Sequence, residues 1–146
     1  GGGKMIRPWN KADTEAVAEI EARSFPDPWR ERMLSESLDV PAFNGFVYED
    51  EGEIIGYIGF ILPEDAEIAL IAVREDRRRG GIGEKLLMHA LEQAKEGGAT
   101  NVLLEVRQSN YAARALYEKN GFVPVYVRKR YYLNGEDALV MVRSLL

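Results

Sequence analysis

The feature that most constrains this chain is a buried strand that leads through an arginine–glycine turn into a helix. Residues 67–73 (EIALIAV) are almost continuously apolar, which predicts a strand buried on both faces. From Ile82 onward the apolar residues recur at helical spacing, as in an amphipathic helix that ends near residues 97–98, both glycine. Between these two elements stands the run REDRRRGGIG, residues 74–83. A chain with this unit is expected to form a sheet covered by helices.

The turn at residues 74–83 has the composition of an anion-binding site. The first amides of a helix lack intrahelical acceptors, and the helix dipole adds partial positive charge at the same place. Gly80, Gly81 and Gly83 would let a phosphate approach the backbone, and the neighbouring arginines would add bidentate hydrogen bonds. The local sequence leaves one alternative open, a solvated basic turn.

Two common phosphate-binding loops are excluded by the spacing of these glycines. A Walker loop requires a glycine, four further residues and then Gly-Lys-Ser/Thr, which residues 80–87 (GGIGEKLL) lack. The dinucleotide fingerprint requires a third glycine after Gly81 and Gly83, at the position that Leu86 occupies. The sequence therefore predicts an anion site of another kind.

The remaining segments alternate between strands and helices in the order β-α-α-β-β-β-α-β-α-β-β, which describes a mixed sheet covered by helices. The expected strands lie within residues 4–9, 67–73, 101–108, 122–133 and 136–145, with two more within 43–62. The expected helices lie within residues 13–25, 29–38, 82–96 and 111–120. Asn134-Gly135 is the strongest short hairpin signal, so it predicts a tight turn between the last two strands.

Composition excludes several classes of site. The chain has no cysteine, which excludes disulfides and a thiolate zinc site, and its single histidine, His89, cannot build a histidine metal site. The net charge of −5 argues against general nucleic-acid binding. No apolar run approaches the roughly 20 residues of a membrane span, and no signal-peptide core is visible. We therefore expect a metal-free cytoplasmic protein of one domain, residues 5–146, with residues 1–4 (GGGK) as an added remnant before Met5.

Two motifs resemble the signatures of the GNAT superfamily of N-acetyltransferases. Residues 78–83 (RRGGIG) fit its acetyl-CoA loop, Gln/Arg-x-x-Gly-x-Gly/Ala, and stand between a strand and a helix as in that family. Residues 109–123 (SNYAARALYEKNGFV) resemble its second signature, Asn-x-x-Ala-x-x-Leu-Tyr-x-x-x-Gly-Phe. The stretches at 103–110 (LLEVRQSN) and 24–29 (SFPDPW) narrow the resemblance to the ribosomal-protein N-terminal alanine acetyltransferases, the RimI-like type. One departure is Leu70, where this type often has asparagine.

The resemblance implies a fold and a cofactor. The fold is α/β (α+β), a twisted mixed sheet of about seven strands flanked by about four helices and splayed open between the strands at 67–73 and 101–108. Acetyl-CoA is the implied cofactor, with no metal; its pantetheine arm would lie in the splay and its pyrophosphate on the turn. The residues implied to bind it are Ile71, Ala72, Val73, Arg78, Arg79, Gly80, Gly81, Ile82, Gly83, Glu84 and Asn110.

The resemblance also assigns roles to residues whose local pattern indicates only structure. Glu105 alternates with apolar residues, and this local pattern indicates a salt-bridged surface carboxylate, or one paired with Arg107. The resemblance instead implies that Glu105 is the general base. Tyr117 reads by spacing as a core residue, whereas the resemblance makes it the acid that protonates the departing CoA thiolate. Asn110 reads as a helix N-cap and, by resemblance, also as a contact of the pantetheine arm.

Four residues are implied to contact the peptide acceptor: Phe25, Pro26, Tyr131 and Tyr132. The alternative for residues 25–29 is that they only join two helices, and the alternative for the two tyrosines is sheet packing. Adjacent strand residues face opposite sides, so at most one of the tyrosines is expected to enter a given pocket.

The implied function is transfer of acetyl from acetyl-CoA to the N-terminal α-amine of a protein or peptide, by direct attack of the amine on the thioester. A ribosomal protein is one partner that the resemblance suggests, while nucleic acid and membranes are not expected partners. Two alternatives stay open: an enzyme of the same fold acting on lysine, a polyamine or another small amine, and a non-catalytic CoA-binding regulator. Glu105 and Tyr117 argue against the regulator. The sequence leaves the oligomeric state open.

Overall fold

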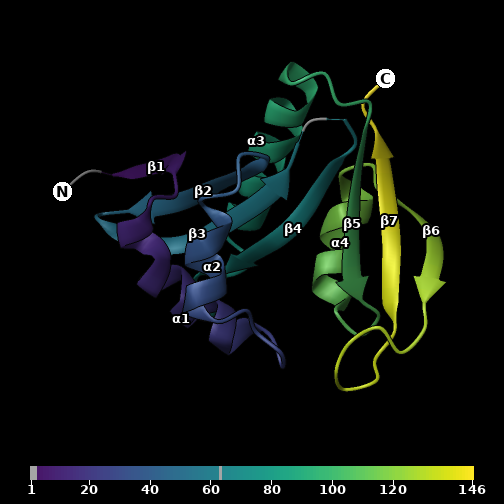
Figure 1. Ribbon diagram of the computed structural model, residues 1–146, viewed down its shortest axis with the longest axis horizontal. Coiled ribbons are helices and arrows are strands. Elements are labelled where there is room, and N and C mark those ends of the chain that lie inside the picture. The colour runs from purple at the N-terminus through teal and green to yellow at the C-terminus, as the bar shows by residue number, and fades with distance from the viewer. Residues whose placement is uncertain (1–2, 63) are drawn as a thin grey trace.

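The computed structural model describes residues 3–62 and 64–146 and contains a seven-stranded mixed sheet (Figure 1). The strands lie side by side in the order β1-β2-β3-β4-β5-β7-β6. Their bounds are Lys4–Pro8 (β1), Phe43–Asp50 (β2), Glu53–Ile61 (β3), Ala66–Val73 (β4), Asn101–Arg107 (β5), Val123–Arg128 (β6) and Ala138–Ser144 (β7). The α/β fold class is confirmed. Lys4, which we expected to belong to an added remnant, is the first residue of β1 and pairs with Asp50.

The sheet opens between its two central strands. β4 and β5 run parallel, and only residues 66–68 of β4 pair with residues 102–104 of β5. Beyond these pairs the strands diverge, because β4 continues alongside β3 and β5 continues alongside β7. Figure 1 shows that β4 and β5 lie close together where they begin and move apart toward their arrowheads, which are their C-terminal ends. The predicted splay is therefore confirmed.

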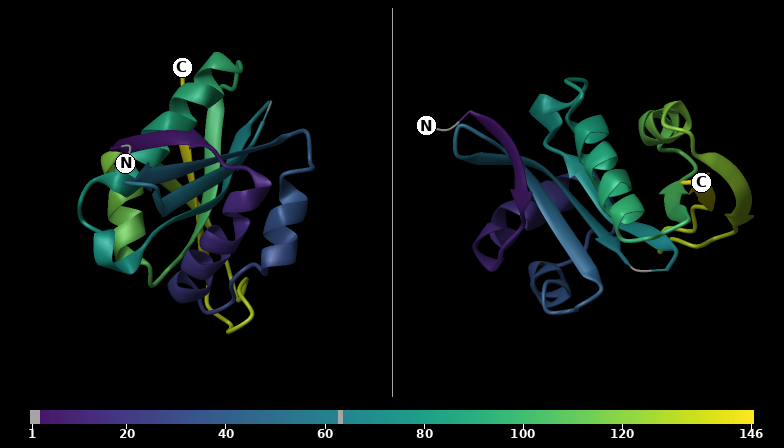
Figure 2. Two further views of the ribbon diagram at one scale, coloured as in Figure 1. Left: turned by 90° about the vertical axis from the view of Figure 1, so that its left-hand side faces the viewer. Right: turned by 90° about the horizontal axis from the view of Figure 1, so that it is seen from above.

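Helices cover both faces of the sheet. α1 (Thr14–Ser24) and α2 (Glu31–Ser37) lie on one face, whereas α3 (Ile82–Glu96) and α4 (Tyr111–Lys119) lie on the other, as the right-hand view of Figure 2 shows. Short 3-10 turns occur at Lys11–Asp13 and Glu75–Arg77. None of the helices in the described part of the chain has the length and apolar character of a membrane-spanning segment.

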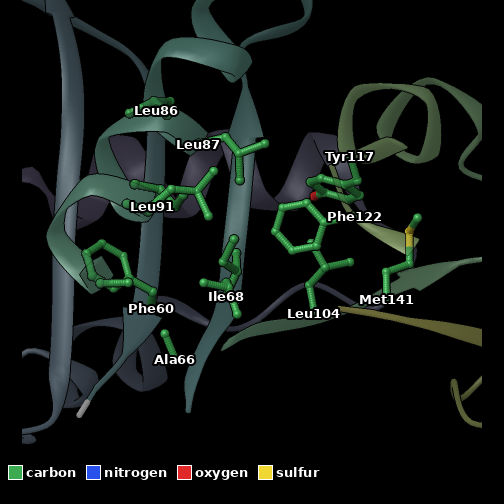
Figure 3. Packing of buried hydrophobic residues seen from close by; sticks show 14 of the residues in the cluster. Phe60, Ala66, Ile68, Leu86, Leu87, Leu91, Leu104, Tyr117, Phe122 and Met141 are labelled. Carbon is green, nitrogen blue, oxygen red and sulfur yellow. The ribbon is translucent and has the colours of Figure 1, made fainter. Parts of the chain in front are cut away.

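The packing of α3 sets the position of its first turn. The helix buries the face that its spacing predicts: Ile82, Leu86, Leu87, Ala90, Leu91 and Ala94. These side chains pack on Phe60 and Ile68 in a cluster that continues to Tyr117 and Phe122 (Figure 3). Burying one leucine or isoleucine side chain contributes about 1.5–3 kcal/mol, so this face anchors the helix firmly. The anchored helix starts beside the end of β4.

The prediction of a tight Asn134-Gly135 hairpin is wrong. β6 ends at Arg128 and β7 begins at its pairing partner Ala138, so residues 129–137 form a long loop. A turn within this loop closes from the Tyr132 carbonyl to the Gly135 amide at 2.8 Å, which puts Asn134-Gly135 in its third and fourth positions. The loop departs from the strands because the side chain of Asn134 is held on β5, as described below.

Candidate active site

Two hollows meet where β4 and β5 diverge. The α3 hollow, about 420 Å³, runs from the end of β4 to the first turn of α3 and to α4. The β5 hollow, about 190 Å³, lies between β4 and β5 and under the loop that follows α1. The residues that line both are Phe25, Ile71, Arg107, Asn110, Ala113 and Tyr117. The two hollows are therefore adjoining parts of one cleft.

A helix N-terminus with unpaired amides borders the α3 hollow. α3 begins after Gly81, whose φ of 82° lies in the left-handed region, and no side chain caps the helix. Among the described residues, the amides of Ile82, Gly83 and Glu84 have no hydrogen-bond acceptor. Gly83 lines the hollow, and a methyl group at this position would lie 3.5 Å from Leu116 in ordinary contact. This turn offers several amide donors to an anion in the hollow.

Two arginines of the run at 74–79 are paired with carboxylates of the protein. Nε of Arg74 lies 2.7 Å from Oδ1 of Asp76, and Nη2 of Arg77 lies 2.8 Å from Oδ2 of Asp50. The positive charge of the run is thus partly neutralised by the fold. These two arginines line neither of the two hollows.

Arg78 is the arginine of the run that lines the α3 hollow. Its Nε donates to the carbonyl of Val73 at 2.9 Å, and its Nη2 donates to the hydroxyl of Ser24 at 3.0 Å. Arg79 follows with a φ of 67°, and the structure records no hydrogen bond or ion pair of its side chain within the described chain. Of the arginines in this run, Arg78 is therefore the one placed to contact a ligand in the α3 hollow.

Some of the predicted loop residues place their side chains away from the hollows. Ile82 is buried in the core under α3. Glu84 turns toward α4, where its Oε2 accepts a hydrogen bond from Nδ2 of Asn120 at 3.0 Å. Gly80 and Gly81 line neither hollow. Only backbone groups of these residues are positioned to act on a ligand beside α3.

The edge of β4 faces the α3 hollow through residues 71–73. On its other edge this segment pairs with residues 56–58 of β3. Because β5 has diverged, the edge toward the hollow has no strand partner among the residues that the structure describes. An extended ligand with amide groups could add along this edge in the manner of a strand.

α4 and its N-cap residue supply two of the predicted residues. Oδ1 of Asn110 accepts the amide of Ala113 at 3.2 Å, which confirms the N-cap prediction. Tyr117 is 5% exposed and packs on Phe122, with ring centroids 5.8 Å apart, so its core position is confirmed as well. In the described chain the hydroxyl of Tyr117 has no hydrogen-bond partner, and burial raises its pKa. The hydroxyl therefore keeps its proton at neutral pH.

Glu105 lines the β5 hollow. Its Oε1 accepts a hydrogen bond from the Tyr131 hydroxyl at 3.3 Å, and its Oε2 lies 2.8 Å from Nε of Arg128. The second contact is an ion pair without hydrogen-bond geometry, since Oε2 is buried and has no hydrogen-bond partner in the described residues. The salt-bridged character is confirmed, with Arg128 as the partner, whereas the alternative of a pairing with Arg107 is wrong because Arg107 binds other carboxylates.

Two loops form facing walls of the β5 hollow. Phe25, in the loop after α1, lines both hollows, and Pro26 lines the α3 hollow. Tyr132, in the loop after β6, lines the β5 hollow, and burial raises its pKa to about 12 against the opposing effect of the nearby arginine. Tyr131 is 51% exposed and reaches Glu105 only through its hydroxyl. One of the two adjacent tyrosines enters the hollow, as expected.

Sequence reasoning missed a buried carboxyl group that lines the β5 hollow. Glu21 of α1 is 2% exposed. Its Oε1 accepts the Tyr57 hydroxyl at 2.5 Å, and its Oε2 accepts the Trp29 amide at 3.0 Å. Burial raises the pKa of Glu21, although both hydrogen bonds act in the opposite direction. The available signal was a charged residue on the apolar helix face, four residues after Val17 and next to Ile20.

Arg107 of β5 is a second residue that was missed as part of the site. It lines both hollows and is 8% exposed. Its guanidinium contacts Asp27 and Glu136 and lies 3.9 Å from the ring centroid of Tyr132. Its place two residues after Glu105 on the same strand was the signal that could have found it.

A further hollow of about 660 Å³ lies between α1 and the turn that joins β2 to β3. It contains none of the predicted site residues. Its lining includes three ion pairs, Arg74–Asp76, Arg74–Glu53 and Glu19–Arg23. Across residues 3–62 and 64–146 there is also no group of three side chains suited to hold a metal ion. The chemistry of the described chain therefore converges on the α3 and β5 hollows.

Known proteins with similar sequences and folds indicate the family to which the chain is related. The sequence matches the family described as Acetyltransferase (GNAT) family over residues 14–122. It is 42% identical to the "Putative ribosomal protein bS18-alanine N-acetyltransferase" of Bacillus subtilis, over 93% of this chain and 92% of the relative. It is 36% identical to an N-alpha-acetyltransferase of Sulfurisphaera tokodaii, over 96% of this chain and 92% of that protein. The crystal structure of the ribosomal-protein-S18-alanine N-acetyltransferase from Escherichia coli has a TM-score of 0.89 and 31% identity, covering 97% of this chain and 94% of that chain.

Proposed function

The chain belongs to the Acetyltransferase (GNAT) family, and we propose that it transfers the acetyl group of acetyl-CoA to the N-terminal α-amine of a protein or peptide. One observation carries this proposal. The α3 hollow, which is bordered by unpaired helix amides, opens at Tyr117 into the β5 hollow, which Glu105 lines. An anionic donor and an amine acceptor can therefore approach one point from two sides.

The residues of the α3 hollow fit acetyl-CoA. The amides of residues 82–84 and the guanidinium of Arg78 would hold the pyrophosphate, and Gly83 leaves room for it. The free edge of residues 71–73 would hydrogen-bond the pantetheine amides, next to the capping residue Asn110. When bound, acetyl-CoA supplies an activated thioester. An amide in the 71–73 segment is suited to polarise the thioester carbonyl.

Two side chains would carry the proton transfers. The amine nitrogen forms a bond with the acetyl carbon while the carbon–sulfur bond breaks, so one proton must leave nitrogen and one must reach sulfur. Glu105, a carboxylate on the β5 hollow, would accept the first, directly or through water. Tyr117, whose raised pKa keeps its hydroxyl protonated, would donate the second. Direct attack requires no nucleophilic cysteine, and the chain has none.

An α-amine suits this site better than a lysine side chain. An α-amino group has a pKa of about 7.7–8.0 and lysine about 10.4, so roughly a tenth of the former is neutral at pH 7 against well under a thousandth of the latter. The β5 hollow of about 190 Å³ suits a small first residue. The names of the relatives from Bacillus subtilis and Escherichia coli specify alanine of a ribosomal protein, which supports a ribosomal protein as the partner.

Two peptides of one sequence test the acceptor. The first has a free N-terminal alanine and a blocked internal lysine; the second has a blocked N-terminus and a free lysine. We expect kcat/KM to favour the first peptide, with the acetylated position identified by mass spectrometry. If the second peptide is preferred, the acceptor is a lysine or small amine. If neither peptide nor free amines release CoA thiol from acetyl-CoA, the chain is a CoA-binding regulator.

A further inference from the structure

Arg107 is the only buried basic side chain among the residues that the structure describes. Its Nη2 donates to Asp27, and its Nη1 donates to Asn134 at 3.1 Å and to Glu136 at 3.2 Å. Asp27 belongs to the loop between α1 and α2, whereas Asn134 and Glu136 belong to the loop between β6 and β7. One side chain on β5 is therefore bonded to both walls of the β5 hollow.

Several contacts join the loop after β6 to the end of β5. The guanidinium carbon of Arg107 lies 3.9 Å from the centroid of the Tyr132 ring. The Oε2 of Glu136 accepts the amide of Ser109 at 2.8 Å, while its Oε1 accepts Arg107. The Oδ1 of Asn134 accepts both Arg107 and the amide of Glu136. These bonds fix the side of the loop that faces the hollow.

The opposite loop depends on Arg107 for its connection to this wall. No other hydrogen bond or ion pair joins the 25–30 segment to the 129–137 segment in the described chain. A buried guanidinium needs carboxylate or carbonyl partners, and its planar fork can meet several of them from different directions. The bridge is therefore specific to arginine.

We propose that Arg107 is a positioning residue that sets the separation of the two walls, and thereby the entrance through which the acceptor reaches the β5 hollow. The proposal rests on the proposed function, because it takes the β5 hollow as the acceptor site. Arg107 acts through Asp27, Glu136 and Tyr132 and need not touch the reacting atoms. Its loss should change acceptor binding much more than cofactor binding.

The first test replaces Arg107 with methionine, which keeps most of the side-chain length and removes the guanidinium. We expect the KM for the alanine peptide to rise and kcat/KM to fall roughly 10- to 100-fold, because a displacement of about 1 Å can have an effect of this size. The kcat at saturating peptide should fall much less than kcat/KM. The Kd for CoA, measured by calorimetry, should change much less than the peptide KM, because the side-chain hydrogen bonds of Arg107 go to none of the residues proposed to hold the cofactor. Arg107→Lys should lie between, since one ammonium group cannot reach all three partners.

Arg143→Met is the matched control. Arg143 is an arginine of the neighbouring strand β7 that donates to the Asn120 carbonyl at 2.9 Å and lines neither hollow. Asp27→Asn and Glu136→Gln each remove the charge on one wall and should each raise the peptide KM. In the Arg107→Met background they should add nothing, because the bridge is already absent. The same pair of variants tests the bridge if Arg107→Met does not fold.

An unchanged peptide KM in folded Arg107→Met, or an equal rise in the KM for acetyl-CoA, overturns the proposal. If the unmodified protein acetylates no α-amine, the proposed function fails separately and amide hydrogen exchange tests the bridge without any substrate. Arg107→Met should then exchange faster in both 25–30 and 129–137, whereas Arg143→Met should not. Unchanged exchange in either segment would mean that Arg107 does not hold the walls together.

Discussion

The α3 hollow and the β5 hollow adjoin at Tyr117 but are built from different parts of the chain. The α3 hollow takes its backbone groups, the amides at the start of α3 and the free edge of β4, from residues 71–84, and side chains of the loop after α1 and of α4 complete its lining. The β5 hollow is bordered by side chains from α1, from β5 and from the loops at 25–30 and 129–137. Ligand binding in the α3 hollow should therefore be sensitive to an added Cβ. The chemistry in the β5 hollow should instead be sensitive to the loss of a functional group.

The two hollows should also differ in how selectively they recognise a ligand. Backbone amides and a helix dipole attract any suitably placed anion, whatever the rest of the ligand is. The β5 hollow instead brings carboxyl, phenol and guanidinium groups together, and such groups select by hydrogen bonding and charge. We therefore expect variants of the two hollows to separate cofactor affinity from acceptor chemistry.

The largest expected effect separates the two hollows most sharply. Glu105→Gln should lower kcat roughly 10²- to 10⁴-fold, the usual worth of a general base, while the Kd for CoA stays unchanged because Glu105 lines only the β5 hollow. Steady-state thiol release and calorimetry measure the two quantities. Glu67→Gln, an exposed carboxyl on the neighbouring strand β4, is the control. A near-normal kcat, with chemistry shown to be rate-limiting, would exclude Glu105 as the base.

Tyr117→Phe tests whether effects on the two hollows can be separated at all, because Tyr117 lines both of them. We expect kcat to fall roughly 100-fold, at the low end for a general acid, since a thiolate with a pKa near 8.5 leaves without much help. The ring keeps its contact with Phe122, so the free energy of unfolding should change little. Tyr126→Phe, on the exposed strand β6, is the control. If CoA binding weakens as much as kcat falls, the hydroxyl serves the α3 hollow rather than proton transfer.

An added side chain beside α3 should have a smaller effect, and it should act on cofactor binding instead of on kcat. Gly83→Val should weaken CoA binding about tenfold, or roughly 1.4 kcal/mol, and leave the peptide KM unchanged at saturating acetyl-CoA. The new Cβ meets Leu116 and Val73 only at ordinary contact distance, so the fold can accept it. A valine at Gly81 is less informative, because the φ of 82° strains any side chain there.

Gly97→Ala is the control for the Gly83 variant. Gly97 lies at the other end of α3 with a φ of −77°, a conformation that alanine adopts freely. Circular dichroism should show that both variants fold, and calorimetry should show weaker CoA binding only in Gly83→Val. Equal CoA affinity in the two variants would argue against the approach of the cofactor to the first turn of α3.

The features of the α3 hollow could be predicted because they are local in sequence. A glycine turn, a helical apolar face and an N-cap are each visible within one short segment, and the structure has the turn before α3, the buried face of α3 and the cap at Asn110. The opening between β4 and β5 was not local; its prediction came from the family resemblance. Even within the turn, the pairing of Arg77 with Asp50 could not be predicted, because it joins the turn after β4 to the distant strand β2.

The features of the β5 hollow could be predicted only in part because they depend on distant contacts. Glu105 was found by resemblance, but its neighbour Arg128 comes from β6 and was not expected there. The bonds of Arg107 join loops from opposite ends of the chain, and the Asn134-Gly135 pair follows those bonds instead of its local hairpin preference. Tertiary contacts therefore override local turn chemistry in this part of the molecule.

The smallest expected effect concerns stability, and it distinguishes the β5 hollow from the α3 hollow in another way. The Glu21 carboxyl lines the β5 hollow, and burial raises its pKa above the unfolded value of about 4.3. The folded protein then binds this proton more readily than the unfolded chain, so the contribution of Glu21 to the free energy of unfolding is fully present below about pH 4.3 and is lost as pH rises through the raised pKa. Glu21→Gln stays neutral and can still hydrogen-bond Tyr57, so it should remove this pH dependence. Urea unfolding at a series of pH values measures this pH dependence as the difference in the free energy of unfolding between the unmodified protein and the variant.

Asp13→Asn should give a difference of the opposite slope, because the hydrogen bond from Arg7 lowers the pKa of Asp13 and that stability is lost as pH falls. A difference for Glu21→Gln that does not vary with pH would show that the buried carboxyl holds the same charge in both states.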